Sequence, residues 1–133
     1  MSVLGTGIDI VETARIRESL QRFGERFLQR CFLPGEIAYC QNMKFPERHL
    51  AARFAAKEAI SKAFGTGIGK QLGWRDLEIA RRDSGEPFVV LHNKALELAR
   101  RRGVETVLVS LSHCNDYAAA QAVIVGKSAG APE

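Results

Sequence analysis

The spacing of apolar residues divides the first third of the chain into one strand and several helical segments. Residues 3–11, VLGTGIDIV, are rich in β-branched residues and punctuated by glycine, which is typical of a strand that another backbone approaches closely. Over residues 12–30 the apolar side chains recur at helical spacing, and Gly24 interrupts the pattern. A further helix is predicted to begin at Pro34, because proline is pre-set for a first helical turn.

Residues 47–64 form the clearest predicted helix of the chain. Its alanines recur at helical steps, which gives a narrow stripe that lets the helix lie very close to a neighbouring element. Gly65 is expected to end the helix as a cap. The alanines of the stripe are Ala52, Ala56, Ala59 and Ala63.

After this helix the apolar pattern changes to that of a hairpin. Residues 76–92, DLEIARRDSGEPFVVLH, predict two strands joined by a turn at residues 83–85. Asn93 is then predicted to cap a short helix over residues 94–102, which stops at Gly103.

The last strands predict a second hairpin and complete the fold class. Residues 104–113 and 117–125 alternate as strands and are closed by residues 114–116. Strand pairs separated by helices, without regular β-α-β alternation, predict an α+β domain with a mainly antiparallel sheet packed on the long alanine-striped helix. A chain of 133 residues is sized for one core, so we expect a single domain over residues 1–126 and a flexible tail over residues 127–133.

Composition narrows the classes of function. The net charge of +4 favours an anionic partner, which could be a nucleic acid, a phosphorylated metabolite or an acidic protein. No apolar run reaches the length of a membrane helix and the N-terminus lacks the features of a secretion signal, so a soluble, cytoplasmic protein with no membrane partner is predicted. The three cysteines match no metal or redox spacing and are expected to be free thiols: Cys31, Cys40 and Cys114.

Two acidic residues stand where they could carry chemistry. Asp9 lies inside an apolar strand, so it is either solvated near a strand end or compensated by a partner. Glu58 lies four residues before Lys62, and taken alone this spacing is that of an ordinary surface ion pair. The pair adjoins the alanine stripe, however, which favours a functional site. Arg53 and Lys57 lie to the other side, so cations are expected to flank Glu58 from two directions.

Two further features have ordinary structural explanations. Residues 65–70, GTGIGK, resemble a phosphate-binding Walker loop but are one residue too short. They also follow a helix where a Walker loop follows a strand, and Gln71 stands where a hydroxyl residue is required. They are therefore expected to be a helix cap and turn. His113 ends a strand, where a lone histidine is more often structural than catalytic.

Three segments carry a more specific signal when they are taken together. They are GIDIVE at residues 7–12, RFAAKEAISKAFGTGIG at residues 53–69 and SLSHCNDYAAAQAVI at residues 110–124. They resemble the signature segments of the holo-acyl-carrier-protein synthases, the short bacterial 4′-phosphopantetheinyl transferases. The segments W-x-D-L-E-I at 74–79 and D-S-G-E-P at 83–87 match in order and spacing, so the resemblance covers nearly the whole chain and implies that family's fold.

The resemblance implies a magnesium-dependent transfer of the 4′-phosphopantetheine arm from coenzyme A to a serine hydroxyl of an apo acyl carrier protein. The reaction releases 3′,5′-ADP and supports fatty acid biosynthesis. Asp9 and Glu58 match the metal ligands and Lys62 the lysine near the reacting phosphates, so these three are the predicted catalytic residues. Glu58, acting through a water, is the predicted base. The positions predicted to contact coenzyme A are Arg53, Lys57, Ser61, Lys62, Gly65, Pro87 and His113, and those predicted to contact the carrier protein are Arg15 and Arg22.

The resemblance also implies an assembly. The short members of the family are trimers with coenzyme A in clefts between subunits, so a homotrimer is predicted in which Asp9 and His113 face Glu58 and Lys62 across an interface. At Cys114 related transferases often carry an acidic residue, so water or the substrate is expected to complete the metal shell here.

Two alternatives to a transferase remain. A basic module that binds nucleic acid would fit the net charge, but aromatic residues make up only 8% of the chain and no stacking platform is evident, so no nucleic-acid partner is predicted. A structural subunit that lost its activity is disfavoured, because every residue carried over from the family is chemically intact.

Overall fold

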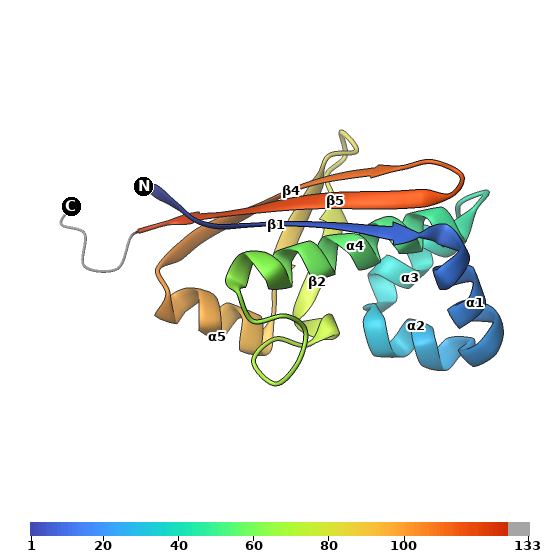
Figure 1. Ribbon diagram of the computed structural model, residues 1–133, viewed down its shortest axis with the longest axis horizontal. Coiled ribbons are helices and arrows are strands. Elements are labelled where there is room, and N and C mark those ends of the chain that lie inside the picture. The colour runs from blue at the N-terminus through green and yellow to red at the C-terminus, as the bar shows by residue number, and fades with distance from the viewer. Residues whose placement is uncertain (128–133) are drawn as a thin grey trace.

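The structure, a computed structural model, describes residues 1–127. Three strands form an antiparallel sheet in the order β1–β5–β4, and this sheet lies along the helix α4, while β2 and β3 pair as a separate hairpin (Figure 1). In chain order the elements are β1 (Ser2–Glu12), α1 (Thr13–Phe23), α2 (Glu25–Cys31), α3 (Pro34–Gln41), α4 (Pro46–Phe64), the 3₁₀ turn η1 (Trp74–Asp76), β2 (Leu77–Arg81), β3 (Pro87–Leu91), α5 (Asn93–Arg101), β4 (Val104–His113) and β5 (Tyr117–Gly126).

The order and type of the predicted elements are confirmed, including the break of the first helix at Gly24. One local prediction is wrong: α5 begins at Asn93, His92 takes the cap position, and no described side chain caps the helix. Asn93 has a φ of 46°, which asparagine tolerates better than most residues, so it contributes backbone conformation and not a side-chain cap. The predicted flexible tail, residues 127–133, lies outside the described residues apart from Lys127.

The strand β1 lies so close to α4 that side chains are excluded between them. A Cβ atom added at Gly7 would stand 1.9 Å from the carbonyl oxygen of Ala59, and one added at Gly5 would stand 2.1 Å from that of Ala63. The glycines of the strand and the alanine stripe of the helix are therefore two halves of one contact. This contact fixes where the residues that follow Gly7 lie along α4.

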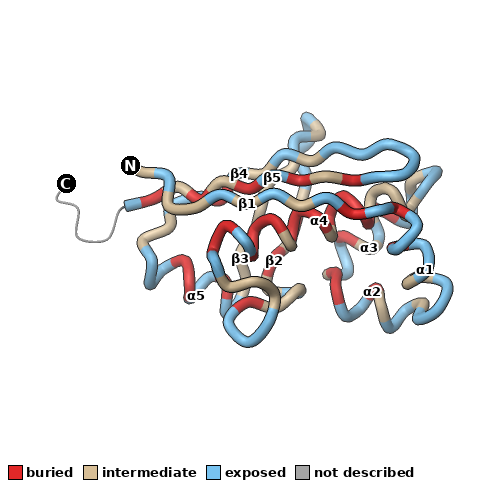
Figure 2. The backbone as a smooth tube through the Cα atoms, in the orientation of Figure 1, coloured by how far each residue is buried: buried red, intermediate tan, exposed pale blue. Residues whose placement is uncertain are grey.

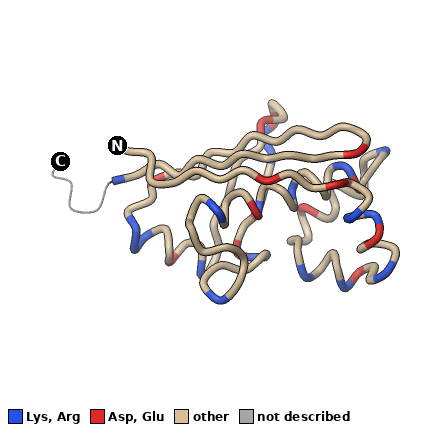
Figure 3. Tube along the Cα trace, viewed as in Figure 1, with Lys and Arg blue, Asp and Glu red and all other residues tan. Residues whose placement is uncertain are grey.

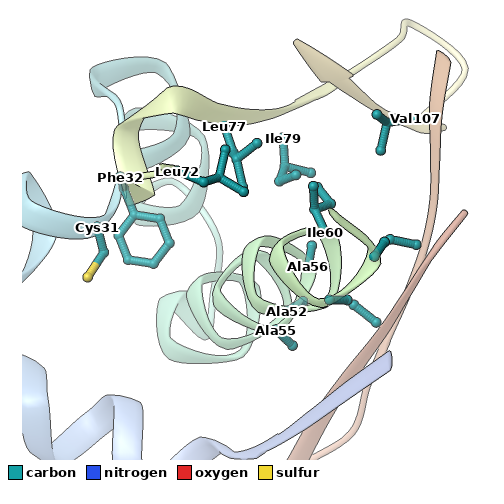
Figure 4. Packing of buried hydrophobic residues seen from close by; sticks show 14 of the residues in the cluster. Cys31, Phe32, Ala52, Ala55, Ala56, Ile60, Leu72, Leu77, Ile79 and Val107 are labelled. Atoms are coloured by element: carbon teal, nitrogen blue, oxygen red, sulfur yellow. The ribbon is translucent and has the colours of Figure 1, made fainter. Parts of the chain in front are cut away.

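The helix α4 forms the centre of the core, and nearly all of its length is buried (Figure 2). The face away from β1 packs against the small hairpin, where Ile60 points toward Leu77 and Ile79 of β2 (Figure 4). Within residues 1–127, no helix combines the length and the apolar character needed to cross a membrane.

The face of the three-stranded sheet that points away from α4 carries several exposed apolar residues. Side chains alternate between the two faces of a strand, and the register of β1, β5 and β4 places four large apolar residues on the outer face. Ile8 is 69% exposed, Ile10 66%, Leu108 54% and Tyr117 49%. Isolated exposed residues of this kind are ordinary, but a group of them on one flat sheet marks a surface suited to contact with another chain.

Candidate active site

The first group of predicted site residues meets where β1 crosses α4. Asp9 points toward the helix, and the Lys62 ammonium donates hydrogen bonds to Asp9 Oδ1 at 2.9 Å and to the carbonyl oxygen of Ile8 at 3.1 Å. Glu58 lies one helical turn before Lys62 on the same helix. The side chain of Lys62 remains about half exposed (51%), whereas that of Asp9 is only 17% exposed. One cation and two carboxylates thus share a partly open site.

The two carboxylates of this site repel one another. Burial raises the pKa of Glu58 above its usual value, the negative charge of Asp9 raises it further, and the Lys62 ammonium acts in the opposite direction. A pair of neighbouring carboxylates suits a divalent cation, and Mg²⁺ in particular takes one or two carboxylates together with phosphate and water oxygens. Among the described residues, no cluster of three or more histidine, cysteine, aspartate or glutamate side chains could hold a metal ion. Phosphate or water oxygens would therefore have to complete its coordination.

The predicted division of the site between subunits needs a correction. Asp9 was expected to face Glu58 and Lys62 from the neighbouring subunit, but it forms an ion pair with Lys62 of its own chain. The close packing of Gly5 and Gly7 on α4 explains the difference, because it brings the strand alongside the helix within one chain.

Lys57 does not join this site, contrary to the prediction that it flanks Glu58 and contacts phosphates. Its side chain is fully buried, and its ammonium donates to Glu36 Oε1 at 2.7 Å and to the carbonyl oxygens of Cys31 at 2.7 Å and Trp74 at 3.1 Å. Burial lowers the pKa of Lys57, and the Glu36 carboxylate opposes that effect. With all three donors of the ammonium engaged, this lysine is part of the core.

A second group of predicted residues lines a separate pocket of about 250 Å³. Arg53 of α4, Pro87 of β3 and His113 of β4 contribute to it, together with His49 and Arg81. Arg53 is only 1% exposed, its Nη1 donates to the carbonyl oxygen of His49 at 3.3 Å, and its Nε finds no acceptor among the described residues.

The charges of this pocket are uncompensated. In the part of the chain that the structure describes, neither Arg53 nor Arg81 forms an ion pair with a carboxylate. The two guanidinium groups lie over the ring of Tyr39 instead, at 4.4 Å and 5.2 Å from its centroid. A buried arginine without a carboxylate is costly unless a ligand supplies the negative charge, so the pocket suits an anion.

The two groups lie on different sides of α4. Arg53 and Lys62 are nine positions apart, which at 3.6 residues per turn places them about 180° apart around the helix axis. Arg53 is five positions before Glu58, about 140° around the same axis, and it lines the separate pocket, so the prediction that Arg53 flanks Glu58 is wrong for a single chain. Each chain presents two half-sites that its own fold keeps apart.

Two other predicted coenzyme A contacts lie at the end of α4. The Ser61 hydroxyl is buried and donates to the carbonyl oxygen of Glu58 at 2.7 Å, so it is engaged within the helix. Gly65 ends the helix in the left-handed conformation with a φ of 78°, which confirms that GTGIGK begins as a helix cap. A Cβ atom at Gly65 would meet nothing within 4 Å in residues 1–127, so the backbone there is open to a ligand.

The predicted carrier-protein residues are exposed on α1. Arg15 and Arg22 line a hollow of about 500 Å³ beside this helix. Basic positions recur along α1 and α2 (Figure 3). An adjoining groove of about 400 Å³ runs between α1, α2 and α4 and is lined largely by aromatic rings and arginines. The sequence analysis missed this groove, although arginines four residues apart beside helical phenylalanines could have indicated it. Its lining includes Phe23, Arg26, Phe27, Arg30, Phe54 and Trp74.

A carboxylate pair beside a lysine, with a separate pocket of unpaired arginines, is an arrangement suited to a protein that handles phosphate groups. Comparison with known proteins identifies the family to which the chain belongs. The family described as the 4′-phosphopantetheinyl transferase superfamily matches residues 5–122. The chain belongs to this superfamily.

Relatives and solved structures agree along nearly the whole chain. The holo-[acyl-carrier-protein] synthase of Moorella thermoacetica is 51% identical over 122 residues, which cover 92% of this chain and 94% of that protein. The crystal structure of the Helicobacter pylori holo-[acyl-carrier-protein] synthase in complex with coenzyme A is 34% identical, with a TM-score of 0.81 over 90% of this chain and 99% of that one. The Neisseria meningitidis enzyme is 32% identical, with a TM-score of 0.87 over 93% of this chain and 99% of that chain.

Proposed function

We propose that this protein is a holo-acyl-carrier-protein synthase. It transfers the 4′-phosphopantetheine arm of coenzyme A to a serine hydroxyl of an apo acyl carrier protein, releases 3′,5′-ADP and supports fatty acid biosynthesis. The observation that carries the proposal is the meeting of Asp9, Glu58 and Lys62 at the crossing of β1 and α4 in a chain of this superfamily.

The chemistry assigns a role to each of these side chains. Asp9 and Glu58 would hold a Mg²⁺ ion, which when bound neutralises charge on the pyrophosphate of coenzyme A. Lys62 is half exposed and adds positive charge where negative charge develops on the transferred phosphate. The serine oxygen forms the new bond to phosphorus, the bond from phosphorus to the 3′,5′-ADP oxygen breaks, and Glu58 accepts the serine proton through a water.

The second half-site is assigned to the nucleotide end of coenzyme A. Arg53 and His113 would bind the 3′-phosphate of the adenosine, and Pro87 would border the same ligand. The support for this assignment is the buried, unpaired Arg53, whose Nε finds no acceptor in residues 1–127. Ser61 and Gly65 belong to the first half-site by their place at the end of α4, with Gly65 offering backbone contact.

A homotrimer is proposed to unite the two half-sites. Lys62 and Arg53 of one chain project from opposite sides of α4, so a single coenzyme A is proposed to contact one half-site on each of two neighbouring subunits. The open apolar face with Ile8, Ile10, Leu108 and Tyr117 supplies a surface for such an assembly. Sedimentation of the protein as a monomer with full activity on dilution would contradict the trimer.

The carrier protein is proposed to dock on α1. Arg15 and Arg22 are exposed there, and the net charge of +4 suits an acidic partner. The adjoining groove with Phe27 and Phe54 offers apolar contact beside this charge. The domain is proposed to span residues 1–126, and the protein is proposed to act in the cytoplasm, in keeping with its three free cysteines.

The test of the function is a mass measurement on the carrier protein. Incubation of the chain with an apo acyl carrier protein, coenzyme A and Mg²⁺ is expected to raise the carrier's mass by one phosphopantetheine arm. Absence of this gain, while a known transferase succeeds in parallel on the same carrier, would refute the proposal.

The roles of the carboxylates are tested by single substitutions. Asp9→Ala and Glu58→Ala are expected to lose transfer activity by about a hundredfold or more, because each removes a charge that acts at the reacting phosphates. Both should keep the circular dichroism spectrum of the parent. Glu97→Ala, which removes an exposed carboxylate of α5, is the matched control and should leave activity unchanged. Full activity of either site variant would remove that residue from the site.

A further inference from the structure

The pocket around Arg53 contains a second histidine, His49, which has no role in the proposed function. His49 of α4 is half-buried, and its ring stands edge to face against that of His113 from β4, with 4.9 Å between the ring centroids. Both imidazoles line the same pocket of about 250 Å³. Since the two rings come from different elements, only the folded chain places them together.

Positive charge faces His49 from α4, β2 and β4. Arg48 and Arg53 lie on its own helix, Arg81 comes from β2 and His113 from β4, while the ring of Tyr39 from α3 lies 6.0 Å away. Burial is the largest cause of the lowered pKa of His49, and these cationic neighbours lower the pKa further. In the absence of an anion the neutral form of His49 is therefore favoured.

We propose that His49 is an additional anion-binding residue of this pocket, and that the pocket takes up a proton when a phosphate monoester of a nucleotide binds there. The inference rests on the proposed function, because that function supplies the 3′-phosphate of coenzyme A as the ligand. A phosphate dianion beside Arg53 and His113 reverses the local field, so that an imidazolium at position 49 is favoured where it was disfavoured before.

The proton uptake gives the affinity a defined dependence on pH. The window lies between the lowered pKa of His49 in the free protein and its higher pKa in the complex. Below this window His49 is protonated in both the free protein and the complex, and above it His49 is neutral in both. Within the window only the complex holds the extra proton, so the affinity for the phosphate falls as pH rises. One linked proton limits the fall to about tenfold per pH unit.

The experiment is calorimetric titration with adenosine 3′,5′-bisphosphate from about pH 6 to about pH 8, the range in which histidine titrates. Titration in two buffers of different ionisation enthalpy counts the protons taken up. His49→Phe is the matched variant, because it keeps an aromatic ring against His113 and cannot titrate. Wild-type protein is expected to take up more protons than His49→Phe and to lose affinity several-fold more across the range.

Adenosine 5′-monophosphate, which lacks the 3′-phosphate, is the ligand control. With it, the two proteins should show the same proton uptake and the same pH dependence. The second ionisation of the ligand's own phosphates is common to both proteins and cancels in the difference between them.

The outcomes separate the two claims. Bisphosphate binding with equal proton uptake in wild-type protein and His49→Phe overturns the role of His49 and leaves the transferase assignment standing. Failure of wild-type protein to bind the bisphosphate overturns both. Should His49→Phe not fold, the ring resonances of His49 in the wild-type protein, followed by NMR with and without bisphosphate, decide the matter: an upward shift of its pKa supports the inference, and no shift overturns it.

Discussion

The buried pair of Lys57 and Glu36 gives the sharpest prediction about the fold, because the sequence pattern pointed to a different role for Lys57. The two side chains are 0% and 1% exposed, and Lys57 Nζ lies 2.7 Å from Glu36 Oε1. Glu36 also accepts the backbone N–H groups of Leu33 at 2.9 Å and Ile79 at 2.9 Å. One carboxylate thus joins α3, α4 and β2.

The perturbation is Lys57→Met, which keeps the length of the side chain and removes its charge. It leaves the Glu36 carboxylate buried with two backbone donors but no cation, and removal of one partner of a buried pair costs about 3–5 kcal/mol. Lys57→Met combined with Glu36→Gln removes both charges, so it is expected to lose less than the sum of the two single variants.

The assay is urea unfolding followed by circular dichroism, at one protein concentration for all variants because assembly contributes to apparent stability. The Michaelis constant for coenzyme A is measured on the folded fraction of Lys57→Met and is expected to match that of the parent. A loss of less than about 1 kcal/mol in the free energy of unfolding, together with a raised Michaelis constant for coenzyme A, would refute the structural role. It would instead support contact between Lys57 and the phosphates of coenzyme A.

Two further predictions concern the packing of β1 and the thiols. Gly7→Ala should destabilise the fold by about 1–3 kcal/mol in urea unfolding, because its Cβ would stand 1.9 Å from the carbonyl oxygen of Ala59. Gly69→Ala, whose Cβ meets nothing within 4 Å in the described chain, is the control, and an equal loss in both would contradict the close contact. Burial raises the pKa of Cys31 and of Cys40 from 9.0 to about 11, so both thiols stay protonated in the folded protein where they ionise in the unfolded chain. The free energy of unfolding should therefore fall as pH rises from 9.0 toward 11, and a double alanine variant with the same pH slope as the parent would contradict this.

Local pattern was enough to predict the elements of this fold. Helical spacing, strand alternation and turn residues act over a few positions, and each predicted element appears in its predicted order. The close contact of β1 and α4 was also foreseeable, since glycines on a strand and an alanine stripe on a helix both permit close approach. Pairing of Asp9 with its own chain's Lys62 follows from that contact.

The partner of a buried charge could not be predicted in the same way. Helical spacing indicates the direction in which Lys57 points, but Glu36 lies 21 positions earlier and reaches it only because α3 packs beside α4. The same holds for the pocket of Arg53, where His49 and His113 meet from α4 and β4. A helical wheel shows neighbours on one helix and says nothing about which distant element supplies the opposite charge.

The separation of the half-sites on α4 has a consequence for the proposed assembly. A change of side-chain rotamer does not remove this separation, because α4 holds Arg53 and Lys62 about 180° apart around its axis. In the proposed trimer a coenzyme A that touches both residues joins two subunits, so its binding energy also stabilises the contact between them. Coenzyme A should therefore shift the sedimentation of dilute protein toward the trimer, and adenosine 3′,5′-bisphosphate, which keeps the 3′-phosphate but lacks the phosphopantetheine arm, should shift it far less. If coenzyme A leaves the sedimentation unchanged, the whole binding site lies within one chain, and that result would contradict this assembly.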